Sequence, residues 1–150
     1  MRYCQAWRSM TNRFCRVLGL FVFATVAAFA QNGRTIQVDV TYMGSGTVNA
    51  SHKIYVALWD SADFNSGPPV ATKSLDTKKG TVTFTNVGTV PAYVSTAYDP
   101  TGAWDAQSPP PSGTSLGMYT TKPPEPAPID VAPGKTVKVK INFDDAIKVP

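Results

Sequence analysis

Apolar side chains recur at every second position in this chain, and that period limits its possible folds more than any other feature. Residues 36–42, 81–85 and 136–143 alternate between apolar and polar side chains. Successive side chains of a β-strand point to opposite faces, so these segments are predicted to be strands with one buried face. Lys138 and Lys140 fall on the polar face of the last segment, where we expect them to be exposed and to protect a sheet edge.

Two other segments, 54–59 and 90–98, are apolar on both faces, which is typical of central strands. Pro91 has no N–H group to donate, so the second of these strands is expected to begin there. Weaker strand signals cover 70–75 and 116–120. The predicted strands are therefore short and numerous.

The turns between these segments complete the prediction of the fold. Lys79-Gly80 is a tight-turn signal, and it predicts that the strands on either side of it pair as a hairpin. No segment after residue 30 keeps the 3.6-residue period of a helix. About seven strands without a helix predict an all-β domain, a single antiparallel β-sandwich of transthyretin-like or Ig-like type over 31–150. The Pro-rich segments 108–112 and 122–128 are expected to be extended loops, with a polyproline ligand for another domain as the alternative.

Residues 1–30 have the three parts of a secretory signal peptide. A cationic stretch, 1–16, precedes an apolar stretch, 17–30, which ends in Ala28-Phe29-Ala30. This pattern predicts a signal-peptide helix that is cut after Ala30, so the mature protein is expected to be secreted or periplasmic. The apolar stretch is shorter than the roughly 20 residues that a permanent span needs, and no stable membrane span is expected after cleavage. An uncleaved N-terminal anchor is the alternative.

The charge of the chain separates into the same two parts. The formal charge is +4, from 14 Lys and Arg against 10 Asp and Glu. Four of the arginines, but none of the acids, lie within 1–16, so residues 31–150 are neutral. Nucleic acid is therefore not an expected partner, because its binding depends on a cationic field. Cys4 and Cys15 also lie in the leader, so the core alone must stabilise the mature domain.

Most catalytic arrangements lack residues in the mature domain. His52 is its one histidine and it has no cysteine, so neither a zinc site nor a well-supported Ser-His-Asp triad is expected. Paired carboxylates are the remaining chemistry: a glycosidase needs two of them about 5–10 Å apart in one cleft. Asp60 and Asp99 each follow a strong strand, and we expect that they are able to meet at one end of the sandwich. Turn formation is the alternative role for these aspartates.

Aromatic residues adjoin the same acids. Converging loops would give aromatic faces edged by carboxylates, which is chemistry that binds sugars or cations. For Trp59 the alternative is packing under the loop 99–113. The predicted ligand-binding residues are Trp59, Asp60, Asp63, Tyr98 and Trp104, and the predicted metal ligands are Asp99 and Asp105.

The order of these features resembles secreted bacterial sandwich domains of the transthyretin-like and carboxypeptidase-regulatory-like group. In that group an early strand ends in an acidic turn, as 54–60 does, and a "G-x-V-x-F-x-x-V" strand follows, as in 80–87. A tyrosine strand then ends in Asp, as in 91–99, and a "P-G-K" turn, here 133–135, precedes the last strand. The resemblance covers most of 34–145 and implies the sandwich fold.

A set of uncharacterised secreted proteins resembles this chain further, through an acidic loop after the tyrosine strand. Their "D-x-N-x-N-G-x-x-D" pattern matches Asp99, Gly102 and Asp105, and their "P-x-G-x-x-x-Y" segment matches 111–119 in type. The intervening Asn or Asp positions have become Pro100, Thr101 and Ala103 here. Because Ca²⁺ takes six to eight oxygens, Ca²⁺ is the one cofactor that the loop suggests, with fewer side-chain donors than the pattern has.

These observations favour an exported, non-enzymatic β-sandwich that binds a cation, a carbohydrate or an extracytoplasmic protein at one loop end. Two alternatives are an Asp-pair hydrolase that acts on an extracytoplasmic polysaccharide and a structural assembly subunit. The hydrolase hypothesis predicts at least one carboxyl group with a raised pKa, whereas carboxylates that form turns have lowered pKa values.

Overall fold

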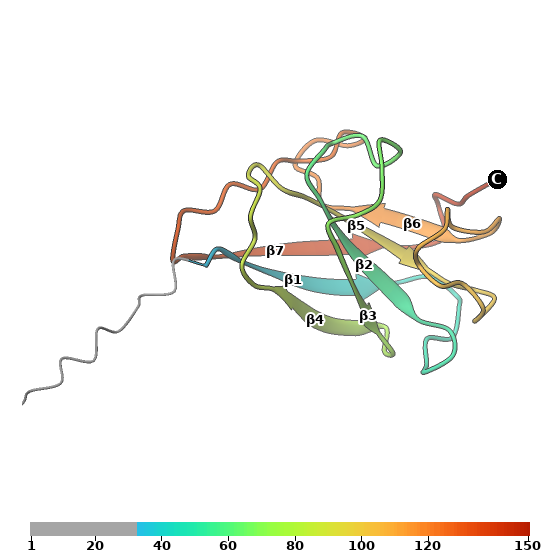
Figure 1. Cartoon of the computed structure of the whole chain (residues 1–150). Coiled ribbons are helices and arrows are strands. Elements are labelled where there is room, and N and C mark those ends of the chain that lie inside the picture. The colour runs from blue at the N-terminus through green and yellow to red at the C-terminus, as the bar shows by residue number, and fades with distance from the viewer. Residues whose placement is uncertain (1–32) are drawn as a thin grey trace, which may run out of the picture.

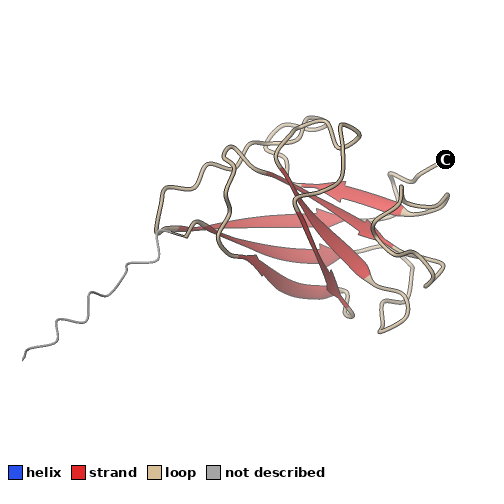
Figure 2. Ribbon diagram, viewed as in Figure 1, coloured by secondary structure: helices blue, strands red, loops and turns tan. Residues whose placement is uncertain are grey.

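The computed structural model describes residues 33–150, and the predicted signal peptide lies outside them (Figure 1). Seven strands and no helix occur within this range, which confirms the all-β prediction (Figure 2). The strands are β1 (Thr35–Tyr42), β2 (Ile54–Trp59), β3 (Ala71–Leu75), β4 (Lys79–Phe84), β5 (Tyr93–Tyr98), β6 (Ser115–Met118) and β7 (Thr136–Phe143).

The strands form two sheets that enclose one apolar core. One sheet has the order β4-β1-β7 and the other has the order β3-β2-β5-β6, so the two strands predicted to be central are central. Alternation places every second side chain of β2 in the core, where Ile54, Val56 and Leu58 are at most 3% exposed. Val38 and Val40 of β1 reach the core in the same way from the other sheet.

One pair of strands departs from the predicted antiparallel arrangement. β1 and β7 are parallel, in a register that runs from Thr35 opposite Thr136 to Tyr42 opposite Phe143. Parallel neighbours need a long crossover connection, and here all the intervening strands supply it. The pattern of alternation is the same for both strand directions, so it does not predict direction.

The predicted hairpin of the third and fourth strands is wrong. β3 pairs with β2, and β4 pairs with β1, so the chain crosses from one sheet to the other between Leu75 and Lys79. Lys79 and Gly80 belong to β4, not to the turn. A Cβ atom on Gly80 would lie 2.8 Å from Cδ2 of Leu75, so the missing side chain allows the crossing to be this tight.

One outer strand of each sheet is protected. Lys138 and Lys140 are exposed on β7, which is an edge of its sheet, as predicted. β6 is an edge of the other sheet, and the C-terminal segment 146–149 covers it. Leu116 N–H donates to the Ile147 carbonyl at 2.8 Å, and Val149 N–H donates to the Thr114 carbonyl at 2.9 Å.

Candidate ligand-binding groove

The outer face of the four-stranded sheet carries a row of small side chains between two aromatic residues. On β2 the outward positions are Tyr55, Ala57 and Trp59, because their neighbours face the core. Ala57 lies opposite Thr72 of β3 on one side and Ser95 of β5 on the other. The sheet surface is therefore low along this row and high on both sides of it.

Two loops fold over this face and raise its sides. Phe64, in the loop 60–70, packs on Trp59 with ring centroids 5.3 Å apart. Trp104, in the loop 99–113, meets Tyr55 edge-on with centroids 5.0 Å apart. The result is a groove of about 550 Å³ with an aromatic pair on each side, Trp59 with Phe64 and Tyr55 with Trp104.

The groove is uncharged. It is lined by 22 residues, and none of them is Asp, Glu, Lys, Arg or His. Pro68, Pro69, Pro109 and Pro110 of the two loops add to its apolar character. A charged ligand would lose hydration here without gaining a partner of opposite charge.

The polar atoms of the aromatic residues are already paired within the protein. Nε1 of Trp59 donates to Oγ of Ser95 at 2.8 Å, and the Tyr55 hydroxyl donates to the Trp104 carbonyl at 3.0 Å. Nε1 of Trp104 donates to the Ser108 carbonyl at 2.9 Å. These bonds fix the rings in place, so what they present to the groove is their apolar surface.

Asp99 builds the loop that holds Trp104. Its carboxylate is 1% exposed and accepts hydrogen bonds from the N–H and hydroxyl of Thr101 and from the N–H of Trp104. Burial raises the pKa of Asp99, but these hydrogen bonds outweigh burial and leave the pKa below its ordinary value. Asp99 therefore has the turn-forming role that was the alternative to ligand binding.

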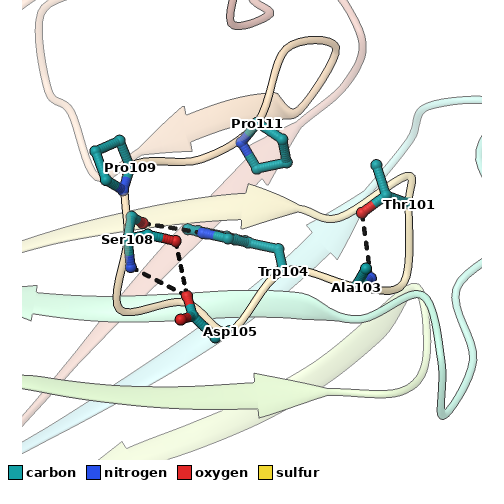
Figure 3. A pocket seen from close by; sticks show the side chains of 7 residues that line it. All are labelled: Thr101, Ala103, Trp104, Asp105, Ser108, Pro109 and Pro111. Carbon is teal, nitrogen blue, oxygen red and sulfur yellow. Dashed lines mark hydrogen bonds between the residues drawn. The ribbon is translucent and has the colours of Figure 1, made fainter.

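Asp105 organises the next turn of the same loop (Figure 3). It accepts hydrogen bonds from the N–H groups of Gln107 and Ser108 and from the Ser108 hydroxyl. The same bonds lower the pKa of Asp105. A second, open hollow of about 300 Å³ lies beside it, with Trp104 and Pro109 among its lining residues.

The expected meeting of Asp60 and Asp99 does not occur. β2 and β5 are antiparallel, with Trp59 opposite Tyr93 and Ile54 opposite Tyr98, so the two aspartates follow opposite ends of the sheet. A six-residue strand at about 3.3 Å per residue separates them by about 20 Å. Only the two loops that begin at these residues converge, and they do so over the sheet face.

Tyr98 lies in the core and not in the groove. It shares the inward face of β5 with Val94, is 6% exposed, and stacks on Tyr42 with centroids 4.7 Å apart. Its hydroxyl donates to the Thr47 carbonyl.

Asp63 is exposed and accepts a hydrogen bond from the N–H of Asn65, which is a turn-forming contact. Trp59 and Trp104 are the two predicted residues that the structure brings together, and they share the groove.

The residues that complete the groove were missed by sequence reasoning. They are Tyr55, Ala57, Phe64 and Ser95. A signal for them was present: the run Tyr55-Val56-Ala57-Leu58-Trp59 places one small side chain between two aromatic ones on a single face.

Within residues 33–150, no three His, Cys, Asp or Glu side chains lie together as a metal site would require. No helix in that part of the chain is long and apolar enough to cross a membrane. Comparisons with protein-family models, with curated proteins and with solved structures return no match to this chain.

Proposed function

We propose that this protein is an exported, non-enzymatic binding module that holds a small ligand in the groove of its four-stranded sheet. One observation carries the proposal: an uncharged hollow of about 550 Å³ with aromatic walls on both sides. Ligand pockets usually measure about 300–1,000 Å³ and are mostly apolar, with few polar groups. The groove thus has the size and lining of a small-molecule site.

Export is proposed from the leader. Its cationic start, short apolar stretch and Ala28-Phe29-Ala30 ending fit a cleaved signal peptide. The seven strands in two sheets support a β-sandwich, and its transthyretin-like type is part of the proposal. Such sandwiches have many functions, so the function rests on the groove.

The carboxylates favour a binding role over hydrolysis. A general acid at neutral pH needs a raised pKa, whereas hydrogen bonds hold the pKa values of Asp99, Asp105 and Asp145 below the ordinary range. Asp60 and Asp99 follow opposite strand ends, which is too far apart for glycosidic chemistry. An assembly role through open edges has less support, because lysines and the C-terminal segment protect two of them.

A variant that fills the groove tests the proposal. Ala57→Trp places a large ring over the floor, and Asn142→Trp places the same ring on the exposed face of β7 as a matched control. The purified protein is screened by thermal shift against neutral small molecules, short peptides and glycans. We expect at least one compound that stabilises the wild type and Asn142→Trp, but not Ala57→Trp. The proposal would be overturned if the same compounds also stabilise Ala57→Trp, or if no compound of the panel stabilises the wild type.

A further inference from the structure

We infer that the ligand of the groove is a neutral aromatic small molecule, held with its ring over Ala57 between the two aromatic pairs. This inference rests on the proposed binding function and adds the class of ligand. The charge of the lining, the state of its polar atoms and the spacing of its walls support it separately.

The lining selects against anions. None of the 22 lining residues carries a charge. Asp99 and Asp105, in the loop beside the groove, accept hydrogen bonds from N–H groups of their own turns. An anion in the groove would therefore lose its hydration without gaining a partner of opposite charge.

The aromatic residues of the lining offer sugars no free hydrogen-bond donor. Each sugar hydroxyl that leaves water needs a protein partner, and an unpaired one costs about 1–3 kcal/mol. The N–H and O–H groups of Trp59, Tyr55 and Trp104 donate to protein acceptors instead. The side-chain amides of Asn65 and Gln107 are on exposed residues, one on each loop, so they suit one or two polar groups at the ends of an otherwise apolar ligand.

The spacing of the wall residues along β2 leaves room for one ring. Tyr55 and Trp59 are four residues apart on β2, which places their Cα atoms about 13 Å from each other. Paired aromatic rings have centroids about 4.5–7 Å apart, so a ring that contacts both walls needs about 9–14 Å between them. Ala57 leaves the intervening floor low enough for such a ring to reach the sheet.

Two fluorescent probes that differ in one group test the inference. N-phenyl-1-naphthylamine is neutral, and 1-anilinonaphthalene-8-sulfonate has the same rings with a negative charge. Each is titrated into the wild type, Ala57→Trp and Asn142→Trp at a temperature where all three are folded by circular dichroism, and cellobiose is titrated by calorimetry. Ala57→Leu replaces Ala57→Trp if the latter does not fold.

We expect saturable binding of the neutral probe at one site, at least tenfold weaker binding of the sulfonate, and no heat from cellobiose. Ala57→Trp should lower the affinity for the neutral probe at least tenfold, whereas Asn142→Trp should leave that affinity unchanged. Equal affinity for both probes, or an Ala57→Trp variant that binds as the wild type does, would overturn the inference.

The outcomes also separate this inference from the proposed function. If cellobiose or a peptide of the thermal-shift panel binds and Ala57→Trp abolishes its binding, while neither probe binds, the groove is a binding site for another ligand class. The inference is then wrong and the proposed function stands. If no probe, sugar or panel compound binds, both are wrong.

Discussion

The hydroxyl of Tyr42 at the end of β1 donates a hydrogen bond to Oδ1 of Asp145, which lies two residues after β7. Asp145 also accepts hydrogen bonds from the N–H and hydroxyl of Ser45 and from the hydroxyl of Ser115 on β6. One carboxylate thus joins the first strand, the loop after it, an edge of the second sheet and the C-terminal segment.

We expect Asp145→Ala to destabilise the protein by about 2–3 kcal/mol. Tyr42 is 2% exposed, so its hydroxyl proton would be left buried without its acceptor, and an unsatisfied group of this kind costs about 1–3 kcal/mol. Urea unfolding followed by tryptophan fluorescence measures the change. Asp144→Ala is the control: Asp144 is exposed and accepts a hydrogen bond from the N–H of Ala146, so its loss should cost less than about 1 kcal/mol. Equal effects of the two substitutions would contradict this role of Asp145.

Acid should remove the stabilisation that Asp145 provides. Hydrogen bonds from Tyr42, Ser45 and Ser115 hold the pKa of Asp145 well below its usual range. Its contribution is complete above the pKa of an unfolded Asp, about 3.9, and is lost as the pH falls toward the folded value. The free energy of unfolding should therefore fall between pH 5 and pH 2.5. Asp145→Asn should show a shallower fall, and an identical slope in both proteins would refute the assignment.

Alkali should act through Tyr42. Burial and the hydrogen bond to Asp145 raise the pKa of Tyr42 to about 12. Because the unfolded chain loses this proton near pH 10, stability is complete below pH 10 and falls as the pH rises toward 12, by at most about 2 kcal/mol. Tyr42→Phe should be less stable at pH 7 but lose less on the way to pH 12. Burial also raises the pKa values of Tyr55 and Tyr98, so a residual slope is expected in this variant.

Gly117→Ala should weaken the contact between the two sheets at β6 and β7. A Cβ atom on Gly117 would lie 2.5 Å from Cβ of Phe143 and 2.7 Å from Oγ1 of Thr96, so the strands would have to separate. We expect a loss of about 1–3 kcal/mol in the free energy of unfolding. Gly88→Ala is the matched control, since nothing lies within 4 Å of its added methyl group. A loss of the same size in the control would show that glycine flexibility, and not the contact, matters.

Millimolar Ca²⁺ should not change the melting temperature. Asp99 and Asp105 both accept N–H groups of their own loop, and an ion would have to displace these bonds. Asp99→Ala should instead lower the stability by about 2 kcal/mol with and without Ca²⁺, because three hydrogen bonds to a buried carboxylate are lost. A rise in melting temperature with Ca²⁺ that is absent in Asp99→Ala would contradict this expectation and support the metal site predicted from the sequence.

Local pattern was sufficient to predict the strands but not their partners. The alternation that ends at Tyr42 and Phe143 depends only on which face is buried, and it was predicted correctly. Which strand lies beside which depends on contacts between distant residues. For this reason the parallel pairing of β1 with β7, and the crossing of the chain after Leu75, were not predicted.

The candidate site was predicted only in part for the same reason. Trp59 and Trp104 are predicted as ligand-binding residues because they are aromatic residues beside acids, and they share the groove. Asp63, Asp99 and Asp105 accept hydrogen bonds from N–H groups of their own turns, which is a common role of Asp in turns. The role of Ala57 was not predicted, because a small side chain has no functional group. Ala57 contributes to the groove by leaving space above the sheet.

The two faces of β2 have different roles, since Val56 and Leu58 belong to the core and Ala57 belongs to the groove. Substitutions at Ala57, Ser95 or Thr72 alter what the groove admits without touching the side chains that hold the sheets together. Under the proposed binding function, a new ligand preference therefore requires changes on the outward face of β2 and not in the core. Descendants of this chain would be expected to conserve the inward positions of β2 while varying the outward ones.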